Sequence, residues 1–179
     1  AVGYAEIGPS TARHALRVFR RRIESRIDEV CHRLEVRWQL TVSAALPEPA
    51  AGDILVLGPR GRRVVSPAAP ACPVVLMRRT GRALAVIYEG TPETLTLAAA
   101  VAKRERLPVT VLVKGEDAAS TARFAAEAAA TFGDGSVTKL AGTDADLLAT
   151  LASLRPRAVV VDACNASIRL DAIVAALGR

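Results

Sequence analysis

The residues of this sequence best suited to chemistry are glycines and arginines that follow an apolar run, in the segment GDILVLGPRGRR at 52–63. An apolar run such as 54–57 is typical of a buried parallel strand, and such strands often lead into phosphate-binding loops. The glycine spacing permits a tight turn, and guanidinium groups pair well with anions. The motif predicts a phosphate site at Gly58, Arg60, Gly61 and Arg62. The alternative is an ordinary turn with solvated arginines, because Gly-x-x-Gly is common.

Two further apolar runs end in polar residues. The run 84–88 precedes Glu89, Gly90 and Thr91, and the run 158–161 precedes Asp162 in the loop DACNAS. Ligands in open parallel sheets bind outside the carboxyl ends of strands, so we expect a ligand site to include such ends. Asp162 and Asn165 are therefore secondary candidates. For Asp162, a helix cap or a hydrogen bond to a ligand is favoured over a role as a catalytic acid.

The elements that position these residues alternate between strands and helices. The strands are predicted at 36–42, 54–57, 72–77, 84–88, 108–113, 136–140 and 158–161. The helices are predicted at 10–34, 92–106, 117–133, 143–155 and 167–178. The fold class that follows is α/β, a flavodoxin-like or Rossmann-like parallel sheet with flanking helices and right-handed crossovers.

Composition sets broad limits on the class of protein. The 179 residues are 51% hydrophobic but only 3% aromatic, which indicates a core of alanine, valine and leucine. No apolar run approaches the length of a membrane span and the first residues do not resemble a signal peptide, so we expect a cytoplasmic protein without membrane contact. Cys31, Cys72 and Cys164 are widely spaced, which argues against a disulfide framework or a metal site.

The net charge of +6 raises the question of a nucleic-acid partner. Much of the excess lies in the predicted helix 10–34, where charged residues fit a solvated surface with pairs such as Arg20 with Glu24. Aromatic side chains that could stack on bases are nearly absent. From the sequence alone we therefore do not expect a nucleic-acid partner.

The segment 52–113 resembles the universal stress protein family, in which a Gly-x-x-Gly strand end precedes a Cys-Pro-Val final strand, here at 72–74. The resemblance extends over 10–179. It implies an incomplete first half at 1–80 fused to a second half at 81–179, with the two related halves arranged as a pseudo-dimer that pairs through final strands.

The resemblance also implies where a nucleotide would bind. Glu89, Gly90 and Thr91 match the acidic turn that contacts base and ribose in nucleotide-binding members, and Gly58 and Gly61 match the first loop glycines. The later Gly-Ser is missing, and the matching pieces belong to different halves. We therefore expect a regulatory or dimerisation module that has lost ATP binding, acting through a homodimer or a protein partner. A module that binds ATP or AMP is the alternative.

An enzyme is not expected. The sequence has no Gly-x-Ser-x-Gly elbow and no complete P-loop lysine motif. An enzyme of unknown type that uses Asp162 or Glu89 is the weakest of the three hypotheses.

Overall fold

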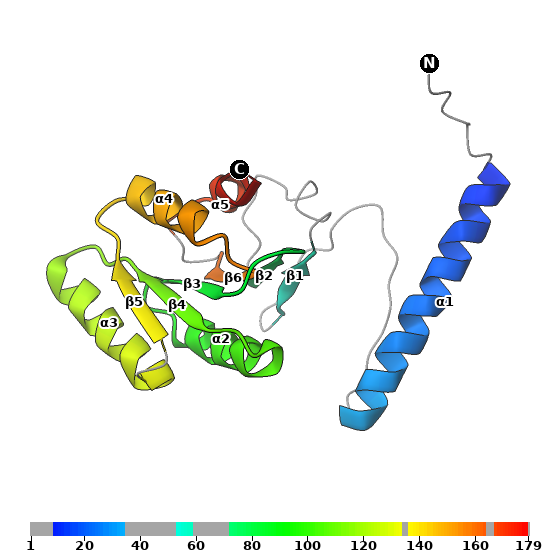
Figure 1. The fold of residues 1–179 in the computed structure, drawn as a ribbon, viewed down its shortest axis with the longest axis horizontal. Coiled ribbons are helices and arrows are strands. Elements are labelled where there is room, and N and C mark those ends of the chain that lie inside the picture. Colours follow the sequence, from blue (N-terminus) through cyan, green and yellow to red (C-terminus); the bar gives the residue numbers. More distant parts are fainter. Residues whose placement is uncertain (1–8, 35–52, 59–71, 134–135, 164–166, 179) are drawn as a thin grey trace, which may run out of the picture. The chain divides into compact units, whose positions relative to one another are not determined.

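The computed structural model describes residues 9–34, 53–58, 72–133, 136–163 and 167–178, in two compact units at 1–44 and 45–179 (Figure 1). The described part of the first unit is the helix α1 (Pro9–Leu34), which confirms the predicted helix. Its charged surface is solvated as expected, because Arg20 pairs with Glu24 at 2.7 Å and both side chains are partly exposed. The strand predicted at 36–42 lies outside the described residues.

The second unit contains a six-stranded sheet in the order β1-β2-β6-β3-β4-β5. The strands are β1 (Leu55–Leu57), β2 (Pro73–Met77), β3 (Leu84–Tyr88), β4 (Val109–Val113), β5 (Ser136–Leu140) and β6 (Ala158–Asp162). Valine, leucine and isoleucine predominate in β2, β3, β4 and β6, which bury most of their side chains, as expected for strands covered on both faces. The α/β, flavodoxin-like fold class is confirmed.

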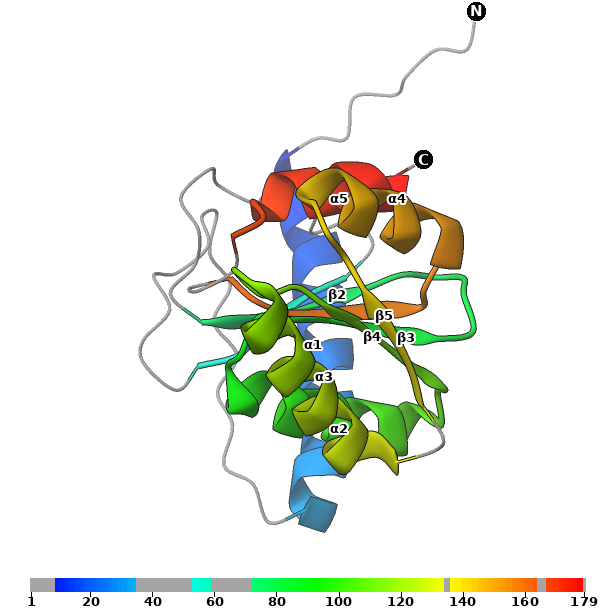
Figure 2. The ribbon, with the colours of Figure 1, turned by 90° about the vertical axis from the view of Figure 1, so that its left-hand side faces the viewer.

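Four helices cover the two faces of this sheet: α2 (Pro92–Glu105), α3 (Ala118–Phe132), α4 (Asp144–Leu154) and α5 (Leu170–Gly178). Figure 2 shows α4 and α5 on one face and α2 and α3 on the other. Two apolar cores result. One joins Leu147 of α4 and Ile173 of α5 to the sheet, and the other joins Leu95 of α2 and Phe124 of α3 to the opposite face.

The sheet departs from the predicted parallel arrangement at one strand pair, so that β1 and β2 run opposite to the other four strands. β2 runs antiparallel to β6, with Pro73 beside Asp162, whereas all the other strand pairs of the sheet are parallel. The physical reason is the short link 78–83 between β2 and β3. A parallel connection needs a crossover of a dozen or more residues, so a strand joined by so short a link must run the other way.

The predicted helix starts are confirmed at α3 and α4. The Asp117 carboxylate accepts a hydrogen bond from the backbone N–H of Ser120, and the Ser120 hydroxyl accepts one from the N–H of Asp117, which completes a capping box. The Thr143 hydroxyl accepts a hydrogen bond from the backbone N–H of Asp146.

Among the described residues, no helix is both long and apolar enough to cross a membrane. The division into halves at residue 80 and their pseudo-dimer arrangement remain predictions.

Candidate functional site at the carboxyl ends of β3 and β6

The strand order reverses between β3 and β6. From β3 the chain passes through α2 to β4 on one side, and from β5 it returns through α4, on the other face, to β6 on the opposite side of β3. Parallel doubly wound sheets bind ligands at such a switch point, beyond the carboxyl ends of the strands. Here the residues 89–91 follow β3 and Asp162 ends β6, so the structure brings together the predicted candidates Glu89, Gly90, Thr91 and Asp162.

Thr91 and Asp162 are joined directly across the switch point. The Thr91 hydroxyl donates a hydrogen bond of 2.7 Å to Oδ2 of Asp162, which is only 8% exposed. Thr91 is the N-cap residue of α2, but its side chain makes no capping bond to the helix. Its hydroxyl therefore stabilises the buried carboxylate of Asp162 by a hydrogen bond, since a buried charge without partners is costly.

Glu89 and Ser167 form a second connection between the same two strand ends. The backbone N–H of Ser167 donates to Oε2 of Glu89 at 2.6 Å, and the Ser167 hydroxyl donates to Oε1 at 2.6 Å. The Lys114 ammonium donates in turn to the Ser167 hydroxyl at 2.7 Å and pairs with Asp144. Both oxygens of the Glu89 carboxylate are thus occupied by groups of the protein itself.

Among the described residues at these strand ends, carboxylates outnumber ammonium groups. The Lys114 ammonium, whose side chain is 20% exposed, pairs with Asp144 and reaches Glu89 through the Ser167 hydroxyl, while the Asp162 carboxylate is bound by Thr91. A phosphate gains when cations and free N–H groups face it, and a surrounding of carboxylates opposes it. The described residues at the switch point therefore surround a ligand mainly with carboxylates, an environment that opposes a phosphate.

Gly90 shapes the turn after β3. Its φ of +103° lies in the region that favours glycine, and a Cβ built on it would stand 2.5 Å from Cζ of Phe124. The Phe124 ring lies edge-on to Tyr88, with 5.5 Å between the ring centroids. Gly90 is thus required by the close approach of the β3 turn to α3, which is a structural reason for a glycine that the sequence assigned to a ligand site.

Gly58 lies at the opposite end of the sheet, where the strands β3, β4, β5 and β6 begin. It follows β1, which runs parallel to β2 and hence opposite to β6, so Gly58 lies near the strand end where β6 begins at Ala158. The structure therefore does not bring Gly58 together with Glu89 and Thr91. The predicted site residues Arg60, Gly61, Arg62 and Asn165 lie outside the described residues.

Sequence reasoning missed Lys114 and Ser167 as members of this network. Lys114 comes directly after the buried run 109–113, and this placement at a strand end was a signal that could have found it. Ser167 was placed in the loop DACNAS and at the start of the predicted helix 167–178, but was not among the candidate site residues. Cys72 is buried, and burial raises the pKa of its thiol, in keeping with an inert apolar role. The described residues hold no cluster that could bind a metal.

Comparisons of the chain with protein-family models, with curated proteins and with solved structures found no match. The resemblance to universal stress proteins rests on the motifs in the sequence.

Proposed function

We propose that this chain is a regulatory module of the universal stress protein type that has lost ATP binding, is not an enzyme, and acts in the cytoplasm through association of its sheet edge. The observation that carries the loss of ATP is the pair of hydrogen bonds from Ser167 to Glu89 at 2.6 Å. They connect the two loops between which a nucleotide would enter. A ligand would have to break both bonds and displace the Lys114 ammonium from Ser167.

Two further features support the loss of ATP. The residues that follow β6, 163–167, contain no glycine, the residue on which phosphate-binding turns usually depend. Gly58 is the glycine expected to contact phosphate. It lies beyond the strand ends opposite those that carry Glu89. A single nucleotide cannot use both sets of residues.

A module that binds ATP or AMP is the second candidate. It is favoured by the position of Thr91 and Asp162 at the switch point, where carboxylate and hydroxyl groups could accept the hydroxyls of a ribose. In that case the ligand would bind through its nucleoside part, with the phosphates directed away from the carboxylates.

One experiment separates the two candidates. Small molecules released from gently purified, acid-denatured protein are identified by mass spectrometry, and the purified protein is then titrated calorimetrically with ATP and AMP. We expect no nucleotide in the first measurement and no heat at millimolar ligand in the second. Nucleotide recovered near one per chain would overturn the loss of ATP binding.

If nucleotide does bind, two variants locate it. Asp162→Asn would weaken binding to the switch point, whereas Gly58→Ala would leave it unchanged, since a Cβ on Gly58 meets nothing within 4 Å. The opposite pattern would place the nucleotide at the predicted glycine loop.

The association surface we propose is the outer edge of β5, in contact with a second copy of the chain. Among the described residues β5 pairs on one side only, with β4, which leaves the backbone groups of its other side open to another strand. Val137 and Leu140 of this strand are 55% and 65% exposed. A strand edge of this kind can pair with itself about a twofold axis, which gives a closed dimer.

The test is the mass of the protein in solution, measured by sedimentation equilibrium. We expect a dimer for the natural chain and a monomer for Val137→Lys combined with Leu140→Lys. The matched control is Val56→Lys on β1, an equally exposed valine on the other edge strand, which should remain dimeric. A monomeric natural chain, or dissociation by the β1 variant alone, would overturn this surface.

A further inference from the structure

At the end of the sheet opposite the switch point, where β3, β4 and β6 begin, three loops pack on one another. These are 78–83 between β2 and β3, 106–108 between α2 and β4, and 155–157 between α4 and β6. Backbone hydrogen bonds join them: the N–H of Arg78 donates to the carbonyl of Arg157 at 2.7 Å, and the N–H of Leu84 donates to that of Pro108 at 2.9 Å. The loops therefore form one surface with a fixed shape.

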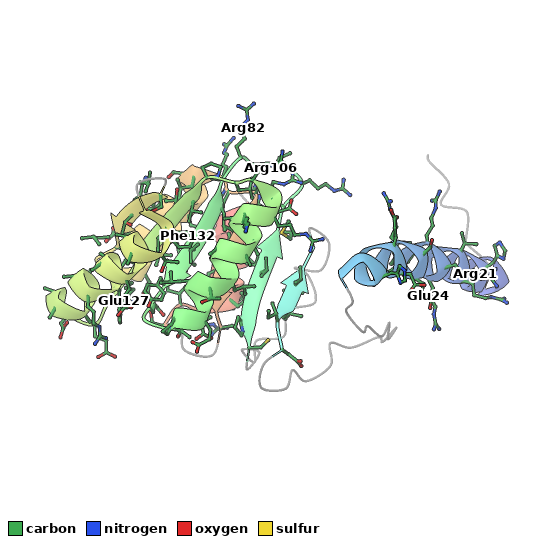
Figure 3. All side chains as sticks on the ribbon, turned by 90° about the horizontal axis from the view of Figure 1, so that it is seen from below. Arg21, Glu24, Arg82, Arg106, Glu127 and Phe132 are labelled. Atoms are coloured by element: carbon green, nitrogen blue, oxygen red, sulfur yellow. The ribbon has the colours of Figure 1, made fainter. Side chains whose placement is uncertain are left out.

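Basic side chains crowd this surface, and in Figure 3 Arg82 and Arg106 project from the same end of the sheet. The described basic residues in these loops and in the helix end beside them are Arg78, Arg79, Arg82, Lys103, Arg104, Arg106, Arg155 and Arg157. Within these loops and the helix end 103–105, Glu105 is the one acidic residue. We name this set the arginine edge.

The arginine edge is unpaired within the described residues. None of its cations forms an ion pair with a described carboxylate, whereas Lys114 at the opposite edge is bound to Asp144. The guanidinium of Arg157 donates to the carbonyl of Arg79 at 3.3 Å, which holds one arginine of the set against the next loop. Cations gathered without counter-ions raise the local potential and attract a polyanion.

Two of these arginines occupy strained positions. Arg106 and Arg155 end α2 and α4 with φ of 52° and 43°, in the left-handed region where helices usually place glycine. The two helices lie on opposite faces of the sheet, yet both keep an arginine where glycine would relieve the backbone. An arginine in a strained backbone conformation at the end of each helix is an outlier that points to a use for the side chain.

We infer that the arginine edge binds the phosphate backbone of double-stranded nucleic acid. Guanidinium groups match phosphate through paired N–H donors, and arginine predominates over lysine in this set. The strand order β2-β6-β3-β4 lines the loops up in a row of about 14 Å, three strand spacings, which suits a linear array of phosphates. No aromatic residue lies in the three loops, so contact is with the backbone and independent of base sequence.

The surface differs from one that binds a membrane. The large apolar side chains that are exposed in the described residues, such as Ile54, Val56, Val137 and Leu140, lie outside these loops, whereas a lipid-binding surface usually inserts apolar groups. Bulk charge and aromatic content could not show this surface, because its residues are spread over three loops that only the sheet brings together.

The test uses the full chain and a fluorescein-labelled DNA duplex of mixed sequence, with affinity measured by fluorescence anisotropy over a series of salt concentrations. The variant is Arg106→Gly combined with Arg155→Gly, which removes two cations where glycine fits the backbone. We expect about tenfold weaker binding or more at low salt. The slope of log affinity against log salt should fall by about 0.9 for each lost contact.

Two controls keep the result interpretable. The variant should unfold at the same temperature as the natural chain or higher, so weaker binding cannot come from unfolding. Arg17→Gln combined with Arg21→Gln removes the same charge from α1 and should leave the affinity within about twofold.

Several outcomes would overturn the inference. The natural chain could fail to bind the duplex at low salt. The glycine variant could bind the duplex as tightly as the natural chain, or the α1 variant could lose as much affinity as the glycine variant. Binding to vesicles that contain phosphatidylserine, without binding to the duplex, would assign the arginine edge to a membrane. Loss of self-association in the glycine variant, without duplex binding by the natural chain, would assign it to a second copy.

Discussion

Gly90 and Phe124 are in such close contact that a side chain at position 90 cannot be added without movement of the ring. A Cβ on Gly90 would stand 2.5 Å from Cζ and 2.6 Å from Cε1 of Phe124. The ring is 8% exposed and packs in the core between the sheet and the helices α2 and α3. The turn after β3 and the position of α3 are therefore fixed together.

Replacement of Gly90 by alanine should destabilise the protein by about 2 kcal/mol or more, because the positive φ and the contact with the ring both oppose a Cβ. The measurement is unfolding in urea. The matched control is Gly133→Ala, which also has positive φ but meets nothing within 4 Å, and which should cost about 1 kcal/mol. Equal losses in the two variants would show that the contact with Phe124 contributes nothing.

Replacement of Thr91 by valine should cost about 1–3 kcal/mol, because it removes a hydrogen bond to the buried Asp162 carboxylate without change of shape. The helix start is not affected, since the Thr91 side chain makes no capping bond. Thr91→Ser keeps the hydroxyl and should cost about 0.5 kcal/mol in the same urea experiment. A serine variant as unstable as the valine variant would contradict this role of the hydroxyl.

The hydroxyl of Tyr88 donates to the carboxylate of Glu127, and Tyr88→Phe should lower stability by about 1 kcal/mol. Burial, followed by the bond to Glu127, raises the pKa of Tyr88. A raised pKa contributes stability that is complete below the ordinary tyrosine value of about 10 and is lost as the pH rises through the folded value.

Absorbance titration of the phenols tests this assignment. The ionisation of Tyr88 should be displaced to higher pH and should coincide with unfolding. Tyr88→Phe should remove the displaced step, and Glu127→Gln, which keeps an acceptor oxygen, should reduce the displacement. Ionisation of Tyr88 near pH 10 in folded protein would contradict the prediction.

Asp117→Ala should lower the melting temperature by roughly 2–4 °C through loss of the cap of α3. Hydrogen bonds from the backbone and side chain of Ser120 lower the pKa of Asp117. A lowered pKa contributes stability above the unfolded value of about 3.9, and this part is lost as the pH falls through the folded value. Asp117→Asn keeps the cap, so it should melt near the natural protein at neutral pH and lose less stability in acid.

Local sequence patterns determined most of the elements. Apolar runs such as 84–88 and 158–161 became β3 and β6, and the helices predicted at 117–133 and 143–155 begin after their N-cap residues Asp117 and Thr143. These features depend on residues near one another in the chain, so hydrophobic periodicity and capping chemistry are enough to find them. Glu89, Thr91 and Asp162 were found in the same way, because each follows or ends an apolar run.

Only the tertiary structure decided which strand ends meet. β2 runs antiparallel to β6, and although the short link 78–83 favours this direction, only the assembled sheet shows that it carries Gly58 to the strand ends opposite Glu89. The bonds from Ser167 to Glu89 join residues 78 positions apart, and the arginine edge draws its cations from three separate loops. Such contacts depend on strand order and direction, which follow from the packing of the whole sheet and not from any one segment.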